Sequence, residues 1–140
     1  MTKQPAGQSV MVPIASGIEL RTIRWEPEEP TLATPWLLVH GLSSNARLWD
    51  GVGRRLAESG HLAVAVDLRA HGLSSKVDGP FDMATVADDL HHLLETLGWP
   101  TANLVGQSWG GNVVVEAAHR HPEQASMVVC VDGGFIRLAN

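Results

Sequence analysis

The sequence predicts an α/β fold, in which an antiparallel hairpin leads into a parallel sheet with helices on both faces. Three observations predict it. Short apolar runs alternate with longer helical segments along most of the 140 residues. The runs after the hairpin are apolar at consecutive positions, as in strands that are buried on both faces. Hydrophobic residues make up 44% of the chain and charged residues 18%, which excludes a disordered chain.

The expected elements follow one another along a single domain over residues 9–140, after a flexible tail over residues 1–8. Val10 to Ile14 and Ile18 to Trp25 are expected to form the hairpin, because turn residues separate two β-type runs. In residues 82–97, apolar side chains recur at helical spacing behind Asp82, a favourable N-cap. Further helices are expected through about residue 58 and over 109–119, and further strands over 36–39, 62–66, 102–105 and 127–131.

Charge and cysteine content exclude several classes of protein. Ten Lys and Arg residues stand against fifteen Asp and Glu residues, giving a net charge of −5 without a basic run, so no nucleic-acid partner is expected. Cys130 is the only cysteine, and neither a disulfide within the chain nor a metal site is expected. The N-terminus lacks a signal-peptide core, and no stretch approaches about 18 apolar residues. We therefore expect a cytoplasmic protein without membrane contact.

Glycine-rich and polar turns follow the strands, at the edge where parallel sheets bind ligands. Residues 106–110 form the pattern G-x-S-x-G between a strand and a helix. Such a turn requires flanking residues without a bulky Cβ, and it lifts the Ser108 hydroxyl clear of the sheet. The N–H of Trp109 then lies at a helix N-terminus, where it can stabilise a developing oxyanion. The pentapeptide alone is a weak signal, because glycine and serine are common.

Three features in register strengthen that signal: the G-x-S-x-G turn, His40-Gly41 after an earlier strand, and the D-L-R-A-H-G sequence at 67–72. Together they resemble the α/β-hydrolase superfamily of serine esterases and lipases, from about Val10 to Asn140. The resemblance implies that Ser108 is the nucleophile and that the backbone N–H groups of Leu42 and Trp109 form the oxyanion hole. It also implies a small ester or acyl substrate and no cofactor, with the substrate-binding residues expected to be His40, Gly41 and Phe135.

The resemblance covers only the N-terminal half of the family's pattern. A carboxylate and then a histidine follow the serine in that family, but all seven histidines lie at or before position 121. This sequence shows no counterpart of the family's cap, its last strands or its loop with the triad histidine. Asp132, after the last expected strand, is either the triad acid or a residue that shapes the Gly133-Gly134 turn. His40 and His71 share the active face but match positions that the family uses to shape loops.

Losing a triad histidine costs about 10⁶-fold in kcat, so we expect this chain alone to be weakly active or inactive. The strand from Met127 to Val131 is expected to be an apolar sheet edge, which predicts a homo-oligomer joined along it. One alternative is a non-catalytic half-fold or self-assembling module, and another is a perhydrolase or carbon–carbon bond hydrolase using Ser108. A dinucleotide-binding domain is excluded because the first strand of the parallel sheet has no Gly-x-Gly-x-x-Gly sequence after it.

Overall fold

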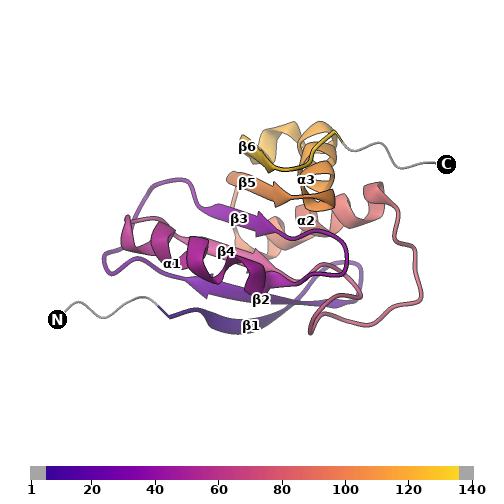
Figure 1. Cartoon of the computed structure of the whole chain (residues 1–140), viewed down its shortest axis with the longest axis horizontal. Coiled ribbons are helices and arrows are strands. Elements are labelled where there is room, and N and C mark those ends of the chain that lie inside the picture. Colours follow the sequence, from indigo (N-terminus) through magenta and orange to yellow (C-terminus); the bar gives the residue numbers. More distant parts are fainter. Residues whose placement is uncertain (1–5, 136–140) are drawn as a thin grey trace.

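A six-stranded mixed sheet organises residues 6–135, the part of the chain that the computed structural model describes (Figure 1). Its strand order is β1-β2-β4-β3-β5-β6. β1 and β2 form the expected antiparallel hairpin, β2 runs antiparallel to β4, and β3, β4, β5 and β6 are mutually parallel. Of the expected tail, residues 1–5 lie outside the described residues. The strands are β1 (Gln8–Pro13), β2 (Glu19–Trp25), β3 (Trp36–Val39), β4 (Ala63–Val66), β5 (Ala102–Gln107) and β6 (Ala125–Val131).

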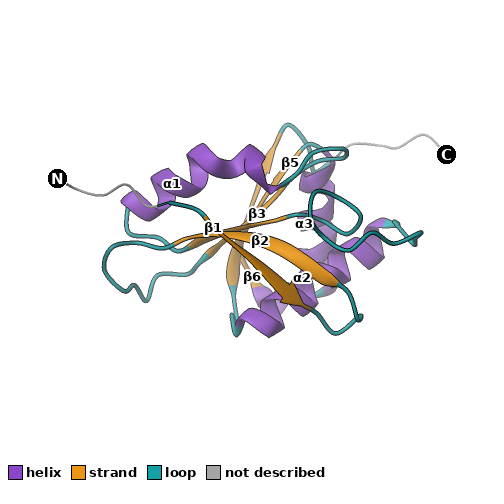
Figure 2. Cartoon of the chain, turned by 90° about the horizontal axis from the view of Figure 1, so that it is seen from below, coloured by secondary structure: helices purple, strands orange, loops and turns teal. Residues whose placement is uncertain are grey.

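Helices cover both faces of the sheet, which confirms the predicted fold class. Figure 2 shows α1 (Asp50–Glu58) on one side and α2 (Met83–Leu97) with α3 (Trp109–Arg120) on the other. Short 3₁₀ turns, η1 (Ala46–Trp49) and η2 (Pro122–Gln124), precede α1 and β6. α2 begins where Asp82 accepts a hydrogen bond from the Thr85 N–H at 3.1 Å, and it ends at Gly98 in a left-handed conformation, φ 73°.

Two apolar clusters, one on each face, hold the layers together. Leu37 of β3 belongs to the cluster beneath α2 and α3, whereas its neighbour Leu38 belongs to the cluster beneath α1. Both leucines are fully buried. Adjacent residues of one strand thus enter opposite cores, which is why the central runs are apolar at consecutive positions rather than alternating. On the α1 face, Gly53 lies so close to the Trp25 indole that a Cβ would collide with the ring.

β6 is an edge strand of the sheet and is largely apolar. Met127 is 51% exposed, Val128 37% and Val131 45%. Among the described residues, β6 pairs with β5 alone. The predicted apolar edge is therefore present, while the homo-oligomer that it suggested remains a prediction. In the same described part of the chain, no helix is long and apolar enough to cross a membrane.

Candidate active site

Ser108 occupies a sharp turn between β5 and α3. Its backbone angles are φ 55° and ψ −126°, in a region that residues with a Cβ rarely adopt. The Ser108 N–H donates to the carbonyl of Val131 at 2.9 Å, and the Ser108 carbonyl accepts from the Gly111 N–H at 2.9 Å. These two bonds fasten the turn to the end of β6 and to the first turn of α3.

Glycines make the space that this turn requires. A Cβ on Gly106 would collide with the backbone of Gly110, and a Cβ on Gly110 would collide with the His40 carbonyl. Gly133, after β6, packs so closely on the Ser108 carbonyl that it too has no room for a side chain. The G-x-S-x-G pattern therefore forms the predicted strand–turn–helix junction, and a third glycine supports it from the turn after β6.

Two backbone amides belong to the segments next to Ser108. Trp109 is the first residue of α3, so its N–H has no helical carbonyl four residues earlier. The Leu42 N–H donates to no other described residue. It belongs to a turn from Gly41 to Ser44, and a Cβ on Gly41 would lie only 3.1 Å from the Ser108 Cβ. The structure thus brings together the serine and both amides that the sequence singled out.

The carbonyl of Gly41 sets the direction of the Leu42 amide. That carbonyl accepts from His40 Nδ1 at 2.6 Å and from the Ser44 N–H at 3.3 Å. The C=O and N–H of one trans peptide point in opposite directions. Because two donors hold the Gly41 carbonyl on one side, the Leu42 N–H faces the other side.

His40 lies beneath this turn and is fully buried. Its Nδ1 donates to a carbonyl, so in the neutral ring Nε2 bears the lone pair, which accepts from the Leu68 N–H at 3.0 Å. Burial lowers the pKa of His40 below its usual 6.5 and keeps the ring neutral. Both ring nitrogens are engaged by backbone, so His40 holds loops rather than contacting the pocket or serving Ser108 as a base.

His71 makes the same kind of contact from the loop after β4. Its Nδ1 donates to the Arg69 carbonyl at 2.9 Å, and its Nε2 accepts from the Ser43 N–H at 3.2 Å. The His40 and His71 rings lie 5.0 Å apart, centroid to centroid. Each of the two histidines on the active face is therefore committed to positioning a backbone segment.

The loop over residues 67–74 is held by buried charges. The Asp67 carboxylate accepts from Arg21 Nε at 2.9 Å, from the Ala46 N–H at 2.7 Å and from the Leu73 N–H at 2.8 Å. Arg69 forms a two-pronged ion pair with Asp89 of α2, at 2.6 and 2.7 Å. The Asp89 hydrogen bond raises the pKa of Arg69, which stays charged.

A pocket of about 340 Å³ opens beside Leu42 and Trp109, and Ser108 is not among its lining residues. Both Leu42 and Trp109 line it, and most of the remaining wall is apolar. Phe135 is 84% exposed and does not contribute to the lining, nor do His40 and Gly41. Sequence reasoning missed Phe81, whose position before α2 carried no signal. The lining residues are Leu42, Leu68, Arg69, Ala70, His71, Phe81, Val86 and Trp109.

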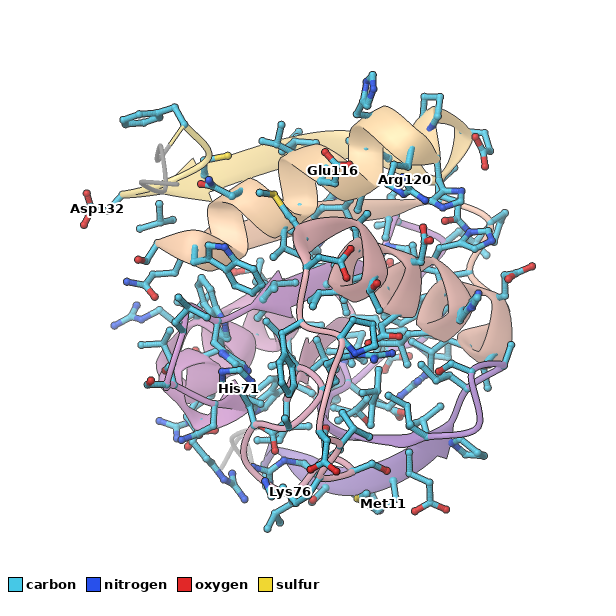
Figure 3. All side chains as sticks on the ribbon, turned by 90° about the vertical axis from the view of Figure 1, so that its right-hand side faces the viewer. Met11, His71, Lys76, Glu116, Arg120 and Asp132 are labelled. Atoms are coloured by element: carbon cyan, nitrogen blue, oxygen red, sulfur yellow. The ribbon has the colours of Figure 1, made fainter. Side chains whose placement is uncertain are left out.

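Asp132 follows β6 in a left-handed conformation, φ 53°, and is exposed. In Figure 3 its side chain projects away from the body of the molecule and lies apart from His71. The next two residues continue the turn, with Gly134 donating its N–H to Asn112 Oδ1 at 2.9 Å. Asn112 is a second residue that sequence reasoning missed. Asp132 lies between Val131, whose carbonyl accepts from the Ser108 N–H, and Gly133, which packs on the Ser108 carbonyl.

Known proteins of the same fold match this chain. The 2-(acetamidomethylene)succinate hydrolase of Mesorhizobium japonicum is 36% identical over 96 residues, which is 69% of this chain and 34% of that protein. A putative non-heme haloperoxidase of Mycobacterium phage D29 is 33% identical over 98 residues, 70% of this chain and 35% of that protein. The solved structure of E-2-(acetamidomethylene)succinate hydrolase is 32% identical, with a TM-score of 0.78. That match covers 87% of this chain and 43% of the solved one.

The chain thus spans about a third of the length of these two curated relatives and less than half of the solved structure. A family model described as alpha/beta hydrolase fold matches residues 34–139, a range that includes the Gly41–Ser44 turn and Ser108. With the sheet order, the strained serine and its supporting glycines, this match shows that the chain belongs to the α/β-hydrolase fold family.

Proposed function

We propose that the chain carries the nucleophile and the oxyanion-binding amides of a serine hydrolase that acts on esters or related acyl compounds. The proposal rests mainly on the backbone conformation of Ser108. Its positive φ costs on the order of 1–3 kcal/mol and persists only where surrounding contacts enforce it. Here hydrogen bonds to Val131 and Gly111 enforce it, and the glycines around the turn are required by it.

In the proposed reaction, Ser108 Oγ attacks the carbonyl carbon of the substrate and gives its proton to a general base. The carbonyl electron pair moves to oxygen, where the N–H groups of Leu42 and Trp109 stabilise the negative charge. The tetrahedral intermediate then expels the alcohol, which takes up the proton, and leaves an acyl-enzyme. Water attacks this ester in the same way, releasing the carboxylic acid and restoring the Ser108 hydroxyl.

We assign neither His40 nor His71 as the general base, because backbone groups occupy both nitrogens of each ring. Asp132 keeps two proposed roles, as a carboxylate that orients a base or as a turn former. Asp132→Asn separates them, because asparagine tolerates a positive φ but carries no charge. Because backbone groups engage both His40 and His71, the proposal expects only weak turnover from this chain by itself.

The pocket suggests the class of group that the substrate presents. Its volume of about 340 Å³ is near the lower end of the range of roughly 300–1,000 Å³ for small-molecule sites. Leu42, Phe81 and Val86 give it an apolar wall. Transfer of apolar surface from water favours binding by about 25 cal/mol per Å². A short alkyl or acyl chain is therefore the proposed occupant.

A second candidate reaction is favoured by the relative named as a putative non-heme haloperoxidase, at 33% identity. In that reaction hydrogen peroxide attacks the Ser108 acyl-enzyme in place of water. The products are a peracid and the free serine, so Ser108 and both amides keep their roles. The two reactions differ only in the attacking oxygen nucleophile.

Hydrolysis of 4-nitrophenyl butyrate tests the proposal, with exogenous imidazole supplied as a base. We expect Ser108-dependent turnover once imidazole is added, after subtraction of the imidazole-catalysed background measured with Ser108→Ala. Ser126→Ala, at an exposed position of β6, is the matched control and should behave as wild type. Equal rates for wild type and Ser108→Ala at every imidazole concentration contradict the proposal. Adding hydrogen peroxide and assaying peracid separates the second candidate from the first.

A further inference from the structure

His71 connects the loop after β4 to the turn that carries one of the two proposed oxyanion amides. Its Nδ1 lies 2.9 Å from the Arg69 carbonyl, which can only accept, so Nδ1 bears the ring hydrogen. Nε2 then bears the lone pair of the neutral ring, and it accepts from the Ser43 N–H at 3.2 Å. The hydrogen-bond pattern therefore selects one tautomer of the neutral form.

The turn that His71 contacts is strained. The Ser44 N–H donates to the Gly41 carbonyl at 3.3 Å, which closes the Gly41–Ser44 turn, and Ser43 at its third position has φ 60°. A turn of this kind favours glycine or asparagine at that position. A residue with a Cβ remains there only when neighbouring groups hold it. The Leu42 N–H belongs to the same turn, so its direction depends on the turn staying closed.

We propose that His71 is a positioning residue: its neutral ring holds Ser43 in the left-handed conformation and thereby keeps the Leu42 N–H aimed at the developing oxyanion. Protonation places a hydrogen on Nε2 that faces the Ser43 N–H. The acceptor is then lost, two donors oppose each other and the turn opens. This inference rests on the oxyanion role proposed for Leu42. It adds that acid opens the turn and releases the Leu42 N–H from its position.

The ionisable groups around His71 are His40, Asp67, Arg69 and Lys76. Burial lowers the pKa of His40, which favours its neutral ring. Asp67 and Arg69 are each held in a buried ion pair. Lys76 Nζ donates to the Gly72 carbonyl beside His71. Histidine is the side-chain type whose charge ordinarily changes between about pH 8 and pH 5, so these two pH values are the ones to compare.

Amide hydrogen exchange at Ser43, resolved by NMR and corrected for intrinsic exchange rates, tests the proposal at about pH 8 and about pH 5. In wild type we expect protection to fall roughly tenfold at the lower pH, the factor to which loss of one hydrogen bond corresponds. His71→Gln offers an oxygen acceptor that does not titrate, so Ser43 should be protected equally at both pH values. His71→Phe keeps a ring without an acceptor and should leave Ser43 unprotected at both.

His91→Gln is the matched control, because the His91 ring stacks on His121 between α2 and the end of α3, away from this turn. It should retain the wild-type response at Ser43. Protection that is equal at both pH values in wild type, or retained in His71→Phe, overturns the inference. If turnover depends on Ser108 but the protection of Ser43 does not respond to pH, the inference about His71 fails and the proposed function stands. If the protection of Ser43 responds to pH but no Ser108-dependent turnover is found, the proposed function is overturned. The oxyanion role of Leu42, which rests on that function, then fails with it.

Discussion

Two neighbouring aspartates of α2 offer a direct measure of what burial does to an ion pair. Asp89 pairs with Arg69 at 2.6 and 2.7 Å, and the two side chains are only 3% and 7% exposed. Asp88 pairs with Arg120 at 2.9 Å through both oxygens, but those side chains are 36% and 38% exposed. The residue type, the two-pronged geometry and the helix are the same, whereas the two pairs differ in burial and in the further bond of Asp88 to His121 Nε2 at 3.1 Å.

Replacing each aspartate by alanine should therefore have unequal consequences. Asp89→Ala leaves the Arg69 guanidinium buried without its ion-pair partner, which costs about 3–5 kcal/mol in folding free energy. Asp88→Ala leaves Arg120 in solvent, and an exposed pair contributes about 0.2–1 kcal/mol. The gain in helix propensity is the same in both variants and cancels in the comparison. We expect Asp89→Ala to be the less stable by at least about 2 kcal/mol.

Urea denaturation followed by circular dichroism measures both free energies, provided that the transitions are two-state. If Asp89→Ala does not fold, Asp89→Asn keeps one acceptor oxygen for Arg69 and takes its place. Free energies of unfolding that agree within about 1 kcal/mol for the two alanine variants would refute the reasoning. That result would mean that water reaches the Arg69 guanidinium.

Three further predictions follow from other parts of the structure. Gly106→Ala should destabilise the fold by about 1–3 kcal/mol through collision with the α3 backbone, whereas Gly51→Ala, in open space on α1, should stabilise it by about 0.4–1 kcal/mol in the same urea assay. The Arg120 hydrogen bonds, aided by His121, lower the pKa of Asp88 from 3.8 to about 2. The carboxylate therefore stabilises the fold above about pH 4, and wild type should lose its advantage over Asp88→Asn as the pH falls from about 4 to 2. Met127→Lys should weaken self-association along β6 in sedimentation velocity, and a monomeric wild type at micromolar concentration would contradict that expectation.

The fold and the serine turn could be predicted because their signals are local. Consecutive apolar positions indicate strands buried on both faces, and the glycines at 106 and 110 are needed wherever a strand turns sharply into a helix. The position of Ser108 relative to β5 and α3 therefore followed from the sequence.

The roles of the surrounding side chains could not be predicted in the same way, because their partners are distant in the sequence. His40 contacts Leu68, and His71 contacts Ser43, each across 28 residues. Neither sequence position indicates which ring nitrogen bears the hydrogen. The pocket wall shows the same limit: Phe135 was expected near the substrate, whereas Phe81 lines the pocket because the loop before α2 folds over it.

Covalent labelling with an alkyl fluorophosphonate tests the central claim, that Ser108 is a nucleophile placed between two oxyanion-binding amides. The folded chain is incubated with the probe in the presence of imidazole, and its intact mass and labelled peptide are then determined. We predict one adduct per chain, on Ser108, that is absent from Ser108→Ala and retained in Ser126→Ala. No adduct on a chain that circular dichroism shows to be folded, or an adduct on another residue, would contradict the claim.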